Sequence, residues 1–145
     1  MTVRVQQHAF DAGEELRNFT HPEAGASASF TGLVRGGAVN ALILDHYPGF
    51  TEQEIARIEA DARARFDVLD TLIIHRHGAM QPGEAIVLVA ALSKHRKEAL
   101  ACVDYLMDRL KTEAPFWKRE VRADGEHWIE PRADDYDARA AWEQT

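Results

Sequence analysis

The side chains of this sequence best suited to chemistry are two lysines, Lys111 and Lys118, in the segment Lys-Thr-Glu-Ala-Pro-Phe-Trp-Lys-Arg-Glu of residues 111–120. A lysine amine can lose its proton and then act as a base or a nucleophile, whereas an arginine guanidinium stays charged. The two lysines are therefore candidates to act on a small anionic substrate. A helix before Pro115 and a strand after it must position them.

The charge of this region contrasts with that of the whole chain. The 145 residues carry a formal net charge of -7, and such a negative field repels nucleic-acid phosphates and anionic membrane surfaces. From residue 94 to residue 122, however, eight Lys or Arg stand against five Asp or Glu, and all four lysines of the chain lie there. This concentration favours a local site for an anion, although an ordinary solvated face explains it equally well.

Three basic residues, Lys94, His95 and Arg96, stand at the expected start of a helix. The backbone N–H groups at a helix start carry partial positive charge, so acidic side chains are normally preferred there. Together with His95 and Arg96, these N–H groups would form a phosphate site. The alternative is that the three side chains point into solvent and the helix tolerates the repulsion.

Helical spacing puts Lys111 four residues after Met107, at the margin of the expected buried stripe. Partial burial there would lower the pKa of Lys111, but a lysine in the last turn also stabilises the helix dipole, and the spacing fits both. In the strand expected next, Phe116, Lys118 and Glu120 share one face. Glu120 would hold the Lys118 amine in place, or the pair is a charged edge that discourages aggregation.

Other candidate residues favour structural roles. His75 and His77 share one face of an expected strand, but the sequence places no third ligand to complete a metal site. Cys102, the only cysteine, falls in the apolar stripe of its helix and is expected to be a buried hydrophobic residue. Gly36 and Gly37 indicate a short turn. We therefore expect neither a metal nor another cofactor.

Short runs rich in apolar and β-branched residues predict strands at 3–10, 26–34, 39–47, 71–77 and 84–92, the last of them central and buried. Residues 51–54 predict a capping box that opens a helix with Ile55, Ile58, Ala62 and Phe66 on one face. A second helix has Ser93 as its N-cap and ends before Pro115. Weaker patterns predict a helix at 14–19, strands at 116–121 and 127–130, and a flexible polar tail from about residue 131.

The chain reads as a single α+β domain, residues 1–145. No internal repeat or linker interrupts the pattern, and 46% hydrophobic residues suffice for one core. No apolar run approaches the roughly 20 residues of a membrane span, and the N-terminus lacks the pattern of a signal peptide. We therefore expect a cytoplasmic protein without nucleic-acid or membrane partners.

Four ordered segments carry a family resemblance: Phe-Thr-Gly-x-Val-Arg (30–35), His-Tyr-Pro-Gly (46–49), Ser-x-His-Arg (93–96) and the segment at 111–120. Together they resemble the MoaE family, the large catalytic subunit of molybdopterin synthase. The resemblance implies an α/β-hammerhead fold with a mainly antiparallel sheet and flanking helices. It also implies a homodimer of large subunits within a heterotetramer, with a small ubiquitin-like sulfur-carrier subunit at each end.

In that family the carrier ends in a Gly-Gly thiocarboxylate that supplies sulfur to cyclic pyranopterin monophosphate, and two rounds create the dithiolene of molybdopterin without a metal. The matching motifs imply that Lys111 and Lys118 are catalytic. Lys111 would meet the carrier's terminal carbonyl, while Lys118 with Glu120 would orient and protonate the substrate. The residues implied in substrate binding, some of which can arrive across the dimer interface, are Leu33, Val34, Arg35, His95, Arg96, Lys111, Lys118, Arg119 and Glu120.

One departure from the family pattern concerns the loop after Arg35. Only Gly-Gly-Ala separates Arg35 from Val39, where relatives carry a longer polar loop, so we expect a trimmed flexible loop and intact activity. Two other functions fit the same residues. One is a non-enzymatic adaptor that binds a ubiquitin-like tail, and the other is a phosphate-ligand enzyme such as an acyltransferase that uses no carrier.

Overall fold

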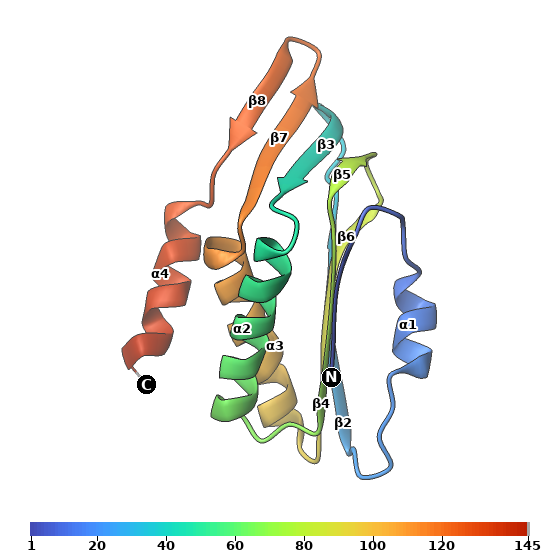
Figure 1. The fold of residues 1–145 in the computed structure, drawn as a ribbon, viewed down its shortest axis with the longest axis vertical. Helices are drawn as coiled ribbons and strands as arrows, with labels where there is room; N and C mark the ends of the chain where they lie inside the picture. The colour runs from blue at the N-terminus through green and yellow to red at the C-terminus, as the bar shows by residue number, and fades with distance from the viewer. Residues whose placement is uncertain (145) are drawn as a thin grey trace.

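Two four-stranded β-sheets form the frame of the computed structural model of this chain, which describes residues 1–144 (Figure 1). The first sheet contains, in spatial order, β1 (Thr2–Gln6), β4 (Asp70–Arg76), β6 (Ala85–Ser93) and β2 (Ala26–Leu33). The second contains β5 (Gly78–Met80), β3 (Val39–His46), β7 (Phe116–Arg122) and β8 (Gly125–Ile129). β1 and β4 run parallel, and the other described pairs are antiparallel, which confirms the predicted α+β class.

The helices cover both faces of the first sheet. They are α1 (Ala12–Asn18), α2 (Phe50–Arg65), α3 (Arg96–Glu113) and α4 (Ala133–Ala141), followed by a 3-10 turn at Trp142–Gln144. α1 lies on one face of the first sheet, and α2 and α3 lie on the other (Figure 1). β6 is central and buried, as predicted: Val87 and Val89 pack in the cluster that contains α2 and α3, and Leu88 packs in the cluster next to α1.

Helix α2 has the predicted buried face but a different start. Its buried residues include Ile55, Ile58 and Ala62. The capping box predicted at 51–54 does not form, because the N-cap is Gly49, with a φ of 85° that favours glycine. The Gly49 N–H donates a hydrogen bond to Glu52 Oε2 at 2.6 Å. The helix cap therefore begins two residues earlier than predicted. Only the hydrogen bond to the glutamate carboxylate forms, because Gly49 has no side chain to make the reciprocal one.

Thr51, which is fully buried, ties α2 to the segment that carries the two lysines. Its hydroxyl accepts a hydrogen bond from the Tyr47 N–H at 2.9 Å and donates one to the Pro115 carbonyl at 3.2 Å. Pro115 stands between α3 and β7, and the preceding Ala114 is extended, as the proline predicts. The threonine hydroxyl therefore holds the junction between Lys111 and Lys118.

Helix α3 begins later than predicted. Ser93 is not its N-cap, because the Ser93 hydroxyl donates to the Asp67 carbonyl at 2.8 Å and accepts from the His95 N–H at 3.3 Å. The N-cap is His95, without a side-chain cap, and the first helical residue is Arg96. Lys94 and His95 thus precede the helix instead of occupying its first turn.

The first strand is shorter than predicted and ends at Gln6. The Arg76 guanidinium donates two hydrogen bonds, of 3.0 and 2.8 Å, to the Gln7 carbonyl. The chain leaves the sheet there, and Phe10 packs with α1 over the face that contains Leu88. A tertiary contact, which local propensity does not encode, therefore ends the strand.

The expected polar tail contains α4, a helix that the sequence pattern does not indicate. None of its residues is buried, so it lacks a strong apolar stripe. It is attached at its C-terminal end: Arg139 pairs with Glu113 at 3.0 Å, and the Trp142 indole N–H donates to Asp108 at 2.7 Å. The Trp142 ring also packs edge-on against Tyr105. Among the helices within residues 1–144, none is long and apolar enough to cross a membrane.

We expect Thr51→Val to lower the free energy of unfolding by about 1–3 kcal/mol, because it leaves a buried N–H and a buried carbonyl without their partner. Thr51→Ser, which keeps the hydroxyl, should retain most of that stability. Urea denaturation of the three proteins measures both effects. A valine variant as stable as the wild type would show that the hydroxyl does not hold the junction.

Candidate functional site

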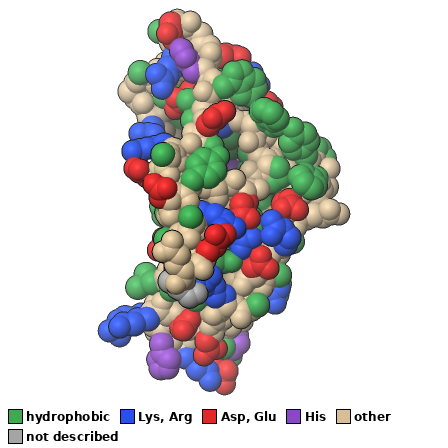
Figure 2. Space-filling view, turned by 90° about the vertical axis from the view of Figure 1, so that its left-hand side faces the viewer, with side chains coloured by type: hydrophobic (Ala, Val, Ile, Leu, Met, Phe, Trp, Pro, Cys, Tyr) green, Lys and Arg blue, Asp and Glu red, His purple; other side chains and the backbone are tan. Residues whose placement is uncertain are grey.

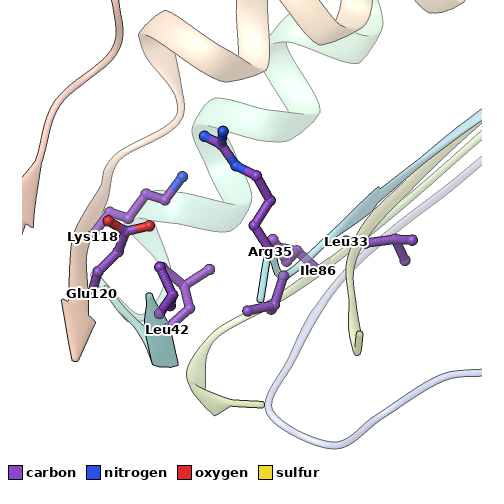
Figure 3. A pocket seen from close by; sticks show the side chains of 8 residues that line it. Leu33, Arg35, Leu42, Ile86, Lys118 and Glu120 are labelled. Atoms are coloured by element: carbon purple, nitrogen blue, oxygen red, sulfur yellow. The ribbon is translucent and has the colours of Figure 1, made fainter. Parts of the chain in front are cut away.

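Lys118 and Glu120 lie on the face of β7 that meets the loop after β2. They border a hollow of about 40 Å³ between the two sheets. Figure 3 shows both side chains projecting from β7 and Arg35 facing them from the other side. The hollow is lined by Leu33, Val34, Arg35, Val39, Leu42, Ile86, Lys118 and Glu120. The structure thus brings together five of the predicted substrate-binding residues.

Of the two lysines, Lys118 is half-buried and Lys111 is exposed. Burial lowers the pKa of Lys118, the positive charges of Lys111 and Arg35 lower it further, and Glu120 and Asp135 oppose the shift. Lys111 is exposed, so the predicted burial at the margin of the α3 stripe is wrong. Lys118 lies on β7, which is paired with a strand on each side, whereas Lys111 lies in the last turn of α3. The positive charge of Lys111 lowers the pKa of Lys118.

Glu120 lies beside Lys118, but its closest partner is another cation. Its Oε1 pairs with Arg122 Nη2 at 2.7 Å, while its effect on Lys118 is electrostatic. β7 pairs with β3 on one side and β8 on the other. The interpretation of Lys118 and Glu120 as a charged edge is therefore wrong, because β7 is not an edge strand.

Arg119 points away from the hollow. Its guanidinium pairs with Asp45 at 3.3 Å and with Glu126 at 3.0 Å, and it lies over the Trp128 ring, 5.4 Å from the ring centre. These contacts lie on the face of β7 opposite to Lys118, as strand alternation predicts. Arg119 therefore fastens β7 to its two neighbouring strands.

His95 and Arg96 lie far from the two lysines of the same chain. They are exposed at the start of α3, whereas Lys111 is in its last turn. Fifteen residues of helix separate Arg96 from Lys111, which is about 22 Å. One chain therefore places the predicted phosphate-binding residues in two groups that cannot hold the same small molecule.

A short anchor holds Arg35 at the hollow. The Val34 N–H donates to the Glu84 carbonyl at 2.9 Å, and the Gly83 N–H donates to the Val34 carbonyl at 2.9 Å. Val34 is buried and Arg35 is exposed beside it. Gly37 then turns the chain into β3 with a φ of 71°, which favours glycine.

A second and larger hollow, an aromatic groove of about 630 Å³, opens next to Lys118. Its lining consists of Tyr47, Pro115, Phe116, Trp117, Lys118, Trp128, Ile129, Glu130, Pro131 and Tyr136. Trp117 donates its indole N–H to the Tyr47 hydroxyl and meets Trp128 edge-on at 6.0 Å. Figure 2 shows hydrophobic side chains gathered on the upper part of this side of the molecule. Lys118 is thus shared between the groove and the hollow at Arg35.

Apart from Lys118, the residues that line the groove have no role predicted from the sequence. Strand alternation places Trp117 opposite Lys118, and this is the signal that could have indicated an exposed aromatic surface. Tyr47 and Tyr136, however, come from segments far away in the sequence. Only the packing of β3, β7 and the chain before α4 brings them together.

The His75 side chain packs against the first residue of β7. Its ring stacks on Phe116, with the ring centres 4.0 Å apart, and its Nδ1 donates to the Arg76 carbonyl at 2.8 Å. Burial lowers the pKa of His75 to about 4; the hydrogen bond to Arg76 opposes this shift, and the charges of His77 and Lys118 add to it. His77 stacks on His46 instead. Within residues 1–144, no group of three His, Cys, Asp or Glu side chains is arranged to hold a metal.

Cys102 is buried as predicted, and burial raises the pKa of its thiol to about 12, with Glu59 and Glu98 adding to the shift. A thiol in this environment is inert. The reactive groups of the site are therefore the two amines and the cations around them.

Known proteins share both this sequence and this fold. The family model of the MoaE protein matches residues 5–113. The molybdopterin synthase catalytic subunit of Cereibacter sphaeroides is 47% identical over 146 residues, covering 98% of this chain and 100% of that protein. The solved MoaE protein from Burkholderia ambifaria MC40-6 superposes with a TM-score of 0.82 at 44% identity, covering 98% of this chain and 97% of its own. Molybdopterin synthase from Staphylococcus aureus gives a TM-score of 0.81 at 28% identity, covering 88% of this chain and 96% of its own.

The chain therefore belongs to the MoaE protein family. The family prediction is confirmed, and with it the prediction of a sulfurtransferase of molybdenum cofactor biosynthesis.

We expect the stability of the chain to fall as the pH drops from about 6.5 towards about 4. The unfolded chain protonates His75 near its ordinary pKa of 6.5, while the folded chain protonates it only near 4, so protons favour unfolding between these values. The contribution of His75 amounts to about 2 kcal/mol between pH 7.5 and pH 5. Urea denaturation at both pH values measures it. His75→Gln should lack this part of the dependence, and an unchanged dependence would contradict the assignment.

Proposed function

We propose that this chain is the catalytic subunit of a molybdopterin synthase, in which Lys111 and Lys118 transfer sulfur from a carrier protein to cyclic pyranopterin monophosphate. The observation that carries the proposal is the position of Lys118. Its amine stands where the aromatic groove meets the cationic hollow at Arg35. A group in this place can contact a donor on one side and an anionic acceptor on the other.

The aromatic groove suits the carrier's tail. A Gly-Gly terminus has no side chains, so its extended backbone can lie between aromatic walls and bring its last carbonyl to the lysines. Trp117 and Trp128 are both exposed, and large exposed aromatic side chains are typical anchors of protein interfaces. The small ubiquitin-like subunit with its C-terminal Gly-Gly thiocarboxylate is thus the partner proposed for this surface.

In the proposed reaction, the thiocarboxylate sulfur attacks an electrophilic carbon of the substrate, a carbon–oxygen bond of that carbon breaks, and the departing oxygen takes a proton. Water then cleaves the acyl–sulfur bond. The products are a substrate that keeps the sulfur and a carrier that ends in a carboxylate. The Lys111 ammonium would stabilise the oxygen of the carrier's last carbonyl during cleavage. Lys118, whose lowered pKa makes its proton easier to give up, would transfer protons to the substrate with Glu120 beside it.

The phosphate of the substrate requires more cations than one chain places at the hollow. Arg35 is there, and His95 and Arg96 are about 22 Å away at the other end of α3. A homodimer in which a second copy supplies His95 and Arg96 would complete the site. This supports the heterotetramer of two large and two small subunits.

We expect Lys118→Ala and Lys111→Ala each to lower the rate of sulfur transfer by a factor of about 10²–10⁴, because each removes a group that acts on the reacting atoms. Lys97→Ala, an exposed lysine at the far end of α3, is the matched control and should react at the wild-type rate. The assay incubates the protein with substrate and thiocarboxylated carrier and counts added sulfurs by mass spectrometry.

Two outcomes of this assay would contradict the proposal. Lysine variants that bind the carrier and convert substrate at the wild-type rate would leave only an adaptor role. Product formed without any thiocarboxylated carrier would favour an enzyme that acts on a phosphate ligand by itself, such as an acyltransferase.

We expect Trp128→Ala to weaken binding of the carrier about tenfold or more, as is usual for an aromatic anchor at an interface. Trp128→Phe keeps an aromatic surface and should bind more tightly than the alanine variant. Isothermal titration calorimetry with the carrier measures both affinities. Equal affinities for wild type and Trp128→Ala would place the carrier elsewhere.

A further inference from the structure

The loop after Arg35 is too short and too bare to fix the direction of that side chain. Three residues, Gly36, Gly37 and Ala38, join Arg35 to β3, and all three are exposed. Two of them have no side chain, and glycine leaves the backbone free to adopt many conformations. The placement of Arg35 at the hollow therefore depends on the residue before it, Val34.

Both backbone groups of Val34 bond to the turn at residues 81–84, which joins β5 to β6. The Val34 N–H donates to the Glu84 carbonyl at 2.9 Å, and the Val34 carbonyl accepts the Gly83 N–H at 2.9 Å. Val34 is buried, whereas Arg35 beside it is exposed. The turn at 81–84 thus acts as a clamp on the last fixed residue before Arg35.

An irregularity in the sheet stands directly before the clamp. Gly32 of β2 pairs with Val87 of β6, but the next residue, Leu33, pairs with Ala85. The pairing skips Ile86, which lines the hollow. A bulge of this kind bends the strand and re-aims the side chains near it. The clamp therefore holds the end of β2 in its new direction.

The side chain of Glu84 closes the turn. The Glu84 N–H donates to the Gln81 carbonyl at 3.1 Å, and Oε2 of the Glu84 carboxylate accepts the Gln81 N–H. Pro82 and Gly83 occupy the two central positions, where β-turns favour them. The hydrogen bond from Gln81 lowers the pKa of the Glu84 carboxyl, desolvation opposes this shift, and Arg76 adds to it.

The other oxygen of the Glu84 carboxylate is held from β4, a strand inside the first sheet. Arg76 Nη1 donates to Glu84 Oε1 at 3.3 Å, and the Nε and Nη2 atoms of Arg76 bond to the Gln7 carbonyl. The Arg76 side chain is only 7% exposed, so it is a fixed point. A chain of contacts thus runs from the sheet interior through Glu84 to the residue before Arg35.

We propose that Glu84 is a positioning residue for Arg35. Its carboxylate closes the turn against Arg76, and the turn holds Val34. The Arg35 guanidinium is thereby kept across the hollow from Lys118 (Figure 3). The positioning rests on these contacts, while the anion that Arg35 binds, the phosphate of the substrate, rests on the proposed function.

Charge alone predicts the opposite effect for Glu84. A carboxylate near an anion site repels the anion, so its removal would tighten binding. A carboxylate that acts through the turn has the reverse effect, because without it Arg35 must be ordered at the moment of binding. The direction of the change in substrate binding therefore separates the two roles.

The first test is the sulfur-transfer assay with the thiocarboxylated carrier, run over a range of substrate concentrations. Glu84→Ala should raise KM for the substrate about tenfold and leave kcat within about twofold, since the phosphate takes no part in the bond changes. Glu84→Gln loses the charge but keeps one of the two hydrogen bonds, so its KM should be intermediate. An unchanged or lower KM in Glu84→Ala would overturn the proposal.

The matched control is Glu15→Ala. It breaks the ion pair of Glu15 with Arg4, at the opposite edge of the same sheet, and should keep the wild-type KM. Urea denaturation checks that each variant is folded. If Glu84→Ala does not fold, Glu84→Gln takes its place in every comparison.

A double-mutant cycle tests whether Glu84 acts through Arg35. In an Arg35→Ala background, Glu84→Ala should raise KM no further, because the residue that it positions is absent. A further tenfold rise in that background would show that Glu84 affects binding by another route, and the proposal would be wrong.

Hydrogen exchange tests the clamp without any substrate. Glu84→Ala should speed the exchange of the Val34 and Gly83 amides, and Glu15→Ala should not. Unchanged exchange at Val34 would refute the positioning. If Lys118→Ala proves fully active while Glu84→Ala speeds exchange and raises KM only when Arg35 is present, the proposed function fails and the role of Glu84 stands.

Discussion

Partial burial of one amine, that of Lys118, among cations is the constraint on which the site depends. Lys118 lies between two sheets, with Lys111 and Arg35 near enough to lower its pKa further. Partial burial and nearby positive charges favour the neutral form of the amine, and they act on it only while the backbone around Lys118 is held rigid. The rigidity comes from β3 and β8 on either side of β7, from the Thr51 hydroxyl at Pro115, and from the His75 ring under Phe116.

The two sheets divide the chemistry between them. The second sheet presents the aromatic groove on one side of β7 and the cationic hollow on the other, so Lys118 can meet two ligands. The first sheet and the helix α3 that packs on it set the distance between the two groups of cations. β2 and α3 run side by side over about the same distance, and this separates His95 and Arg96 from Arg35 within one chain. A single copy therefore places these cations in two groups about 22 Å apart.

Several features were predictable because they depend on local chemistry. The buried faces of α2 and β6, the end of α3 before Pro115 and the alternation along β7 all follow from apolar spacing and backbone geometry. The N-cap residues of α2 and α3 were not predictable from local chemistry. Thr51 and Ser93 have ideal capping side chains, but tertiary partners at Pro115 and Asp67 use their hydroxyls instead. The helix α4 was missed because its attachment, through Arg139 and Trp142, is tertiary.

For the site, the sequence by itself determined the family and the residue types: amines at 111 and 118, and cations at 35, 95 and 96. Their motifs are short and local, so they can be read from the linear order. The tertiary structure decided which amine is shielded, because Lys118, on a strand paired on both sides, is half-buried while Lys111, in the last turn of α3, is exposed. It also decided which cations meet, because helix length is fixed at about 1.5 Å per residue and one copy cannot close a gap of that size.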